Sequence, residues 1–554
     1  MKEPAPSPHS SYRDSLVRRI RSLSVDPSGR AAMKMHAMNI LVLWHLDLET
    51  LRSHLQPCYA PNPRGSRPWD PILLLRCYFL GLLLGENITR FVERLRAERV
   101  LRIIAGLPDP RPGDGVEVVR TPGVGTFYDF FHRLHDGPHE RYRGGVVRPS
   151  EDEKRSVKAL RRLESKTAKK TYVKGGPGAR KVRKKKEAQE LRLKEESLAL
   201  TEKIAMELDK SRESSNPEDF TTRLNTLLLE AAVRVSAQKG LLGKLDKLVI
   251  SGDGSPLPTG ASGHGRKECG HSKRERCECP RRFADPNAQR GYDAFRKSYY
   301  FGYHFYELVT GSKGHDLPLY LTLAPANVPE NGMALRSLER LRKHLRDWMP
   351  NATLGTAIFD AGHDNMATHR YLISHGIKPV IPLSCDAPAR HPTRPDLKLS
   401  PKGFPLCEGH AEMAAWGSAG KGTSLFLCPV KAGKLARCPI APEGAEAWSC
   451  QPHLKFGPAV VVRCEENPRL FPEIQRNSKR YSVLYPKRTA SERSNSVKKE
   501  VFGLVRARHR RQSFWLIRLV SIAILQHARA WVADIDLDVF LTELLAPDSE
   551  ATAA

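Results

Sequence analysis

Apolar residues recur at helical spacing through the first quarter of the chain. Between residues 87 and 105, Ile88, Phe91, Leu95 and Val100 follow the spacing of a buried helix face. Further apolar periodicity or continuous apolar runs predict helices at residues 38–55, 71–84 and 126–134. These segments together predict an all-α N-terminal domain over residues 35–140.

Short apolar runs of strand length replace the helical pattern in the middle of the chain. Helical segments at 333–348 and 366–374 separate the later runs and give the order β-β-β-α-β-α-β, which predicts an α/β domain. A cysteine-bearing insertion at 384–475 follows the first part of this domain, residues 240–383. The second part, residues 476–535, contains predicted helices at 485–499 and 514–532. The predicted strands are residues 244–250, 298–309, 317–323, 354–359 and 378–383.

Positive charge changes the picture of residues 141–220, between the two predicted domains. The chain of 554 residues carries a net charge of +29 and has a pI near 9.8. Lysine and arginine dominate this stretch, most densely at residues 180–186, so it cannot bury a core and is predicted to be a basic linker or arm. A protein this basic is expected to bind a polyanion, most often nucleic acid, although a solvated cationic linker has the same composition. The helical N-terminal domain is then a candidate DNA-binding domain.

Two apolar runs were compared with the requirements of a membrane span. Residues 71–84 contain Arg76 and residues 514–528 contain Arg518, and both runs are shorter than the about 20 apolar residues that a span needs. The first thirty residues contain no apolar segment of the kind found in signal peptides. The sequence therefore favours a cytoplasmic protein with no membrane association, in which the eleven cysteines stay reduced or bind metal.

Three carboxylates are placed where they could meet. Asp253 is predicted in a glycine-flanked turn at the end of one strand, and Asp360 at the end of another. Because ligands of α/β sheets gather at strand ends, the two aspartates can converge there, with Glu492 arriving from a helix. Such an oxygen-only cage suits Mg²⁺ or Mn²⁺, and paired ions of this kind catalyse in-line displacement at phosphodiesters. Taken singly, each aspartate also fits a plain turn residue.

The helix predicted at 485–499 combines this acid with cations. Arg488, Glu492 and Lys499 fall on one helix face, which fits a metal ligand flanked by phosphate contacts. A solvated basic helix with an internal salt bridge has the same pattern.

The four residues Tyr485, Arg488, Glu492 and Lys499 reproduce a Tyr-x2-Arg-x3-Glu-x6-Lys spacing. In this respect the chain resembles the DDE transposases of bacterial insertion sequences. Asp253, in Ser-Gly-Asp-Gly-Ser, matches the first catalytic aspartate, and Asp360, in Ile-Phe-Asp-Ala-Gly-His-Asp, matches the second. Relatives usually have tyrosine where this chain has His363. Residues 301–304 (Phe-Gly-Tyr-His) and the helical region 40–135 also resemble members of this group.

The resemblance implies an RNase H-like catalytic domain with an inserted cysteine-containing subdomain, preceded by the all-α domain. Asp253, Asp360 and Glu492 would be catalytic and bind Mg²⁺ or Mn²⁺. Arg488 and Lys499 would contact phosphates of double-stranded DNA, with Lys498 as the substitute if the helix is rotated. Tyr485 would contact DNA or position the helix.

The implied reaction is hydrolysis at the end of the element, followed by attack of the exposed 3′-hydroxyl on target DNA. Pairing of two transposon ends would require at least a homodimer in the synaptic complex, and the expected location is the bacterial nucleoid. Two further hypotheses remain open from the sequence, namely a catalytically inactive transposase derivative and a zinc-dependent DNA-binding protein.

Cysteines form two clusters with different prospects. The insertion contains Cys407, Cys428, Cys438 and Cys450, the best four ligands for a structural zinc ion that would fold a small subdomain. An earlier loop contains cysteines and histidines within sixteen positions, without the usual Cys-x2-Cys spacing, so an ordered surface loop with reduced thiols is favoured over a bound zinc ion. That loop holds His264, Cys269, His271, Cys277 and Cys279.

Overall fold

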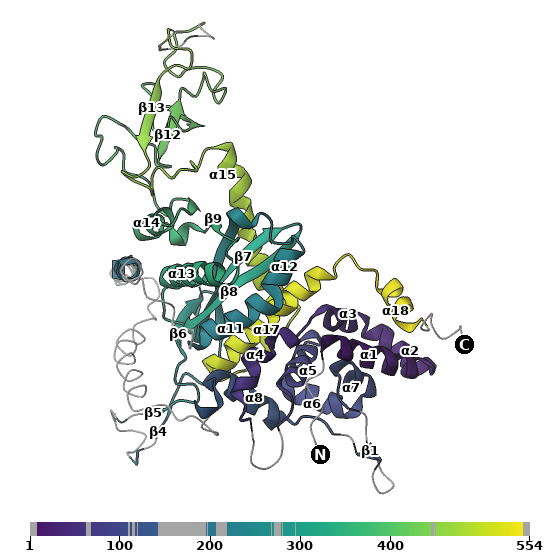
Figure 1. The fold of residues 1–554 in the computed structure, drawn as a ribbon. Helices are drawn as coiled ribbons and strands as arrows, with labels where there is room; N and C mark the ends of the chain where they lie inside the picture. The colour runs from purple at the N-terminus through teal and green to yellow at the C-terminus, as the bar shows by residue number, and fades with distance from the viewer. Residues whose placement is uncertain are drawn as a thin grey trace, which may run out of the picture.

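The computed structural model shows a helical N-terminal region, a mixed sheet covered by helices, and an insertion that projects from one end of the sheet (Figure 1). The predicted mixed α/β class is confirmed. The predicted basic arm lies almost entirely outside the described residues. The structure describes residues 8–61, 68–108, 111–112, 117–118, 120–141, 195–196, 198–206, 219–267, 269–270, 279, 281–293, 295–420, 422–444, 448, 450–451 and 453–546.

The helical region begins earlier than predicted, at His9, and ends near residue 141. The helix predicted at 87–105 is divided at Glu98, whose extended backbone ends α6 and starts α7. The elements are α1 (His9–Ser24), α2 (Pro27–Met35), α3 (Ala37–His45), η1 (Glu49–Leu51), α4 (Arg52–Leu55), η2 (Gln56–Cys58), α5 (Pro71–Leu83), α6 (Ile88–Ala97), α7 (Arg99–Ala105), β1 (Arg111–Pro112), β2 (Glu117–Val118), α8 (Val124–Asp136) and η3 (His139–Arg141).

Among the described helices, none is by itself long and apolar enough to cross a membrane. The pair α5 and α6 reaches that length and hydropathy only when taken together, and its two members are bent by 103°.

The predicted strand and helix order is confirmed in the central sheet. The antiparallel strands β3 (Leu248–Pro258), β7 (Ser298–Ser312) and β8 (His315–Pro325) are followed by α13 (Glu330–Trp348), β9 (Leu354–Ile358), α14 (Met366–Ser374) and β10 (Lys378–Val380). Strands β9 and β10 run parallel to β3, which gives the order β8-β7-β3-β9-β10. Strand β6 (Gln289–Asp293) extends the β8 edge along the first part of β7.

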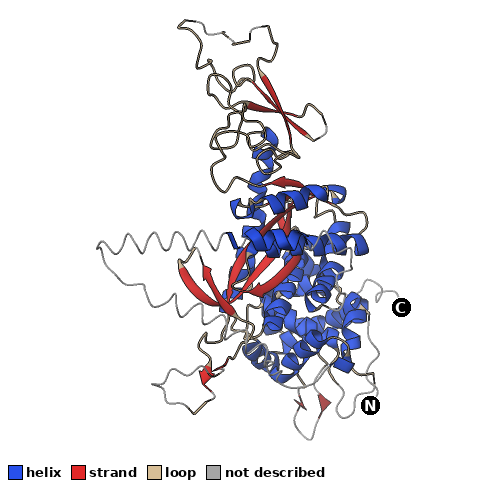
Figure 2. Ribbon diagram, turned by 90° about the vertical axis from the view of Figure 1, so that its left-hand side faces the viewer, coloured by secondary structure: helices blue, strands red, loops and turns tan. Residues whose placement is uncertain are grey.

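Helices cover both faces of this sheet (Figure 2). On one face, Ser337 of α13 bonds to Thr322 of β8. The other face is covered by α16 (Thr489–Glu500) and α17 (Gln512–Trp531), and α17 also packs on α3, α5 and α8 of the helical region. At the outer edge of β8, the side-chain amide of Asn225 donates to the backbone carbonyl of Leu321 and accepts from its N–H, as a neighbouring strand would.

Further elements surround this core. A continuous helical segment precedes β3, formed by α11 (Phe220–Leu228), the π-helical η5 (Leu229–Val233) and α12 (Arg234–Gln238). The remaining elements are η6 (Leu245–Lys247), the paired β4 (Arg266–Lys267) and β5 (Arg281–Arg282), η7 (Ala361–His363), α15 (Lys479–Leu484), η8 (Tyr485–Arg488), η9 (Leu504–Arg506) and α18 (Leu537–Leu545).

The chain between β10 and α15 forms a small three-stranded sheet with its own apolar cluster. Strands β11 (Ala414–Gly417), β12 (Thr423–Leu427) and β13 (Ala459–Arg463) pair antiparallel in sequence order. Phe426 and Phe471 are fully buried within a cluster that is separate from the main core. This cluster is small, because most residues of the segment lie in loops.

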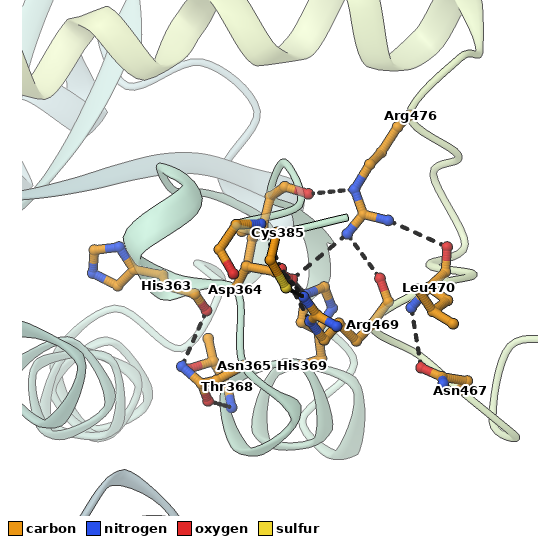
Figure 3. A network of polar contacts seen from close by, with 12 residues as sticks. His363, Asp364, Asn365, Thr368, His369, Cys385, Asn467, Arg469, Leu470 and Arg476 are labelled. Atoms are coloured by element: carbon orange, nitrogen blue, oxygen red, sulfur yellow. Dashed lines mark hydrogen bonds and ion pairs between the residues drawn. The ribbon is translucent and has the colours of Figure 1, made fainter. Parts of the chain in front are cut away.

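A buried carboxylate ties this segment to the sheet (Figure 3). Asp364 accepts hydrogen bonds from Arg469 Nε at 3.0 Å and from the backbone N–H of Ser384 at 2.8 Å. Arg476 lies 3.8 Å from Asp364 and donates to the backbone carbonyl of Ile381. These partners lie near the two ends of the inserted segment. Asp364 therefore holds both ends beside β9 and β10.

Candidate active site

Asp253 lies inside β3, and the prediction that it occupies a turn at a strand end is wrong. The strand continues to Pro258 because β7 pairs with it from Ser251 onwards. Its parallel pairing with β9 does stop at Ser251, opposite Ile358. Asp253 therefore lies just beyond the end of β9, which is the position that strand-end convergence requires.

The glycines beside Asp253 allow side chains of β7 to pack closely, and they do not form a turn. A Cβ atom on Gly252 would lie 2.3 Å from the hydroxyl of Tyr306, and one on Gly254 would lie 2.2 Å from His304 Nε2. Side chains of β7 thus pack directly against the backbone of β3 on both sides of Asp253.

Asp253 is surrounded by other acids. Burial raises its pKa to about 7, and the charges of Glu330, Asp360, Glu307 and Glu492 add to the effect. The side-chain amide of Asn495 donates to Asp253 Oδ2 at 3.2 Å, which links the aspartate to α16. Such a concentration of carboxylates is typical of a cation site.

Asp360 lies two residues after the end of β9, close to the strand end that the sequence predicted, and caps η7 by accepting from the N–H of Gly362. His363 Nδ1 donates to Asp360 Oδ1 at 2.7 Å, while its Nε2 lies 3.2 Å from the hydroxyl of Tyr306. Although burial opposes it, the hydrogen bond from His363 lowers the pKa of Asp360 below its usual range. His363 is buried and stacked on Phe359, and in this position it orients Asp360.

Glu492 projects from the first turn of α16, where its side chain is 46% exposed. Its carboxylate forms an ion pair with Arg488 at 2.7 Å, one helical turn earlier. The helix predicted at 485–499 is interrupted, since Tyr485–Arg488 forms a 3-10 turn that contains Pro486. Tyr485 stacks on Tyr481 at 5.3 Å between ring centroids and so holds this turn in place.

The two neighbouring lysines of α16 point in different directions. Lys498 is fully buried and donates to Glu307 at 2.5 Å and to Ser494 at 2.7 Å. Burial lowers the pKa of Lys498 and raises that of Glu307, while each partner opposes the effect on the other. Lys499 is half-buried, and it lies close enough to Asp253 for the negative charge of that carboxylate to act on the lysine. In this conformation Lys499, rather than Lys498, borders the acidic cluster.

A sequence comparison identifies the family. The profile of the family described as "Transposase DDE domain" matches residues 245–525, which is more than half of the chain. The chain belongs to the DDE transposase family. No curated protein matches it. The catalytic domain of this family is RNase H-like, and the match contains the whole central sheet together with α16.

In this transposase, the acidic residues have the right chemistry for a hard divalent cation but are not arranged around one. Within the described part of the chain, no three His, Cys, Asp or Glu side chains are close enough to hold a metal ion. Two buried oxygens near Asp253, Oδ1 of Asn495 and Oε1 of Glu307, have no hydrogen-bond partner in the part of the chain that the structure describes. An all-oxygen donor set of this kind fits Mg²⁺ or Mn²⁺, and Glu492 would have to leave Arg488 to complete it.

Sequence reasoning missed three residues at this site. Asn495 could have been found, because it lies three positions after Glu492 on the same helix face. Glu330 begins α13 and Glu307 lies opposite Asp253 on β7, so both reach the site through pairings that the sequence pattern does not specify.

In the transposase insertion, Cys450 lies near Cys428 and Cys438, although the three side chains are not close enough to hold a metal ion. Burial raises the pKa of Cys450, and the nearby Cys438, Cys428 and Glu408 raise it further. Cys407 precedes Glu408, and the loop they share lies against Pro439.

The other cysteine positions are only partly described. Cys464 is separate from the three and lies beside Ser424. In the earlier loop, His271 and Cys277 fall outside the described residues, so that cluster stays a prediction.

Proposed function

We propose that this transposase cleaves DNA strands at the ends of an insertion sequence and joins the resulting 3′-hydroxyl groups to target DNA. Asp253, Asp360 and Glu492 would hold the Mg²⁺ or Mn²⁺ ions. The observation that carries the proposal is the position of Asp253 and Asp360 beside the end of the β3–β9 pairing, with α16 bonded to Asp253 through Asn495. Divalent ions at such a site activate the attacking oxygen and stabilise the leaving oxygen of an in-line displacement.

Side chains around the acids would position the DNA. Arg488 and Lys499 lie on either side of Glu492 along the chain, and both are partly exposed. A bidentate guanidinium suits a phosphate, and Arg488 becomes available for one when Glu492 turns toward a cation. Tyr485 would act by holding the turn that carries Arg488. Lys498 is assigned a bracing role, because its ammonium group is enclosed by the protein.

Cleavage of DNA that carries the ends of the element tests this proposal. Inverted repeats identified by searching the DNA that flanks the gene would supply the substrate, and the full-length protein with Mg²⁺ is expected to leave 3′-hydroxyl ends there. Chelation by EDTA should abolish the products, and Mn²⁺ should restore them. Binding to these ends without cleavage in either metal would instead favour a catalytically inactive derivative.

Two copies of the chain are proposed to act together on paired transposon ends, because strand transfer joins both ends to one target.

The basic segment at 141–220 would add sequence-independent attraction to the DNA backbone.

We also propose that the insertion binds one structural Zn²⁺ through Cys428, Cys438 and Cys450, with Cys407 as the fourth ligand. The turns that follow Cys407 and Cys438 are similar, since the carbonyl of each accepts from the N–H three residues later. A metal would compensate for the small apolar cluster of this segment.

Purified protein is expected to contain about one zinc per chain by elemental analysis. Cys438→Ser should lose this zinc, whereas Cys464→Ser is the matched control and should retain it, because Cys464 lies apart from the other three. Zinc near zero in the unaltered protein, purified without chelator, would rule the site out.

A further inference from the structure

Glu330 occupies the edge of β3 where β9 has ended. It is the first residue of α13, and its Oε1 accepts from the backbone N–H of Gly254 at 2.7 Å. The pairing of β3 with β9 stops at Ser251, so this amide bonds to a carboxylate instead of to a strand. Glu330 therefore lies beside Gly254, the residue after Asp253. This position is near the end of β9, which is followed by Asp360.

The backbone is shaped to admit this carboxylate. A Cβ atom at Gly254 would come within 2.8 Å of both Cδ and Oε1 of Glu330, in addition to its clash with His304. The second carboxylate oxygen, Oε2, is 4.0 Å from His304 Nε2, which is beyond hydrogen-bonding distance. His304 Nε2 is itself buried without a hydrogen-bond partner among the described residues. One oxygen of Glu330 is thus fixed by the backbone, and the other remains available.

Glu330 is one of the carboxylates whose negative charge acts on Asp253. The ion pairs found among the described residues give Glu330 no lysine or arginine partner. Two buried oxygens near Asp253 that could accept a cation, Asn495 Oδ1 and Glu307 Oε1, have no hydrogen-bond partner among the described residues, although the other oxygen of Glu307 pairs with Lys498. Asn495 is 4% exposed and Glu307 is fully buried.

We propose that Glu330 is a fourth carboxylate ligand of the divalent cation site and contacts the ion through Oε2. This inference rests on the proposed function, because the ion is the one assigned to Asp253 and Asp360. It extends the metal site to α13, on the face of the sheet opposite α16. Glu330 and Glu492 then approach the aspartates from helices on opposite faces.

The alternative is that Glu330 only fixes the edge of β3, and one substitution separates the two roles. Glu330→Gln keeps a side-chain oxygen that can accept from Gly254 but removes the negative charge. A purely structural role predicts unchanged metal binding, whereas a ligand role predicts weaker binding with the same thermal stability in EDTA.

The test is Mn²⁺ binding to the full-length protein without DNA, followed by calorimetry and by the electron paramagnetic resonance signal of free Mn²⁺. Glu330→Gln is expected to weaken binding about tenfold or more. Asp347→Asn, near the far end of α13, removes the same charge and should bind as the unaltered protein does. Asp253→Asn removes the charge of an assigned ligand, so its Mn²⁺ affinity shows whether the ion binds at the proposed site.

The outcomes separate the two proposals. Weaker binding in Asp253→Asn with normal binding in Glu330→Gln would overturn the role of Glu330 alone. Normal binding in both variants would overturn the metal site.

A second measurement needs no substitution. Fe²⁺ bound in place of Mn²⁺, with ascorbate and peroxide, cuts the backbone near its ligands. Cuts at residues 253, 330 and 360 are expected, and cuts at 253 and 360 without one at 330 would contradict the proposal.

Discussion

Glu492→Gln is expected to lower the rate of DNA strand cleavage by about a thousandfold or more. A carboxylate that completes a divalent metal site supports several kcal/mol of transition-state stabilisation, and about 4 kcal/mol corresponds to a factor of a thousand. The substitution keeps the size of the side chain, and nearly half of the Glu492 side chain is exposed to solvent, so the fold should be unaffected. Single-turnover cleavage of an end-containing duplex in saturating Mg²⁺ measures the rate.

Glu500→Gln is the matched control for this prediction. Glu500 is exposed at the end of the same helix, α16, and its loss removes the same charge. Its cleavage rate should stay within a few fold of the unaltered protein. If Glu492→Gln cleaved as fast as Glu500→Gln, Glu492 would have no part in the chemistry.

Lys498→Met is expected to destabilise the protein by about 3–5 kcal/mol, because it leaves a carboxylate buried without its partner. Lys498 and Glu307 are both 0% exposed, and Ser494 is the only other hydrogen-bond partner found for the ammonium group among the described residues. The free energy of unfolding, from urea denaturation followed by circular dichroism, measures the loss.

The double variant Lys498→Met with Glu307→Met should recover most of this stability, since no unpaired charge then remains. Lys499→Met is the control at the adjacent position. It should leave the free energy of unfolding nearly unchanged but weaken binding to DNA. A loss below about 0.5 kcal/mol in Lys498→Met, the size of an ordinary surface change, would mean that the buried pair does not brace α16.

The order of strands and helices in the core could be predicted because each strand carries a continuous apolar run. The length of β3 could not be predicted in this way. Gly252, Gly254, Pro256 and Pro258 all weaken strand propensity, yet pairing with β7 extends the strand through them. The same glycines suggested a turn, whereas the structure uses them for close packing of Tyr306 and His304.

The signature residues were found by spacing, but spacing alone does not give their orientation. Lys498 and Lys499 differ by about 100° around the helix, so a small rotation decides which one is buried. Pro486 replaces the first helical turn with a 3-10 turn, which changes the path of Tyr485. Glu330 and Glu307 reach Asp253 from positions that are distant in sequence, and only the folded sheet brings them together.

The most direct test of the metal site is the anomalous scattering of Mn²⁺ in crystals of the full-length protein. A Mn²⁺ peak is expected about 2.0–2.6 Å from carboxylate oxygens of Asp253 and Asp360. Glu492 should have left Arg488 and turned toward the ion. Crystals grown in saturating Mn²⁺ with no peak at Asp253 and Asp360, and with Glu492 still paired to Arg488, would rule out the proposed metal site.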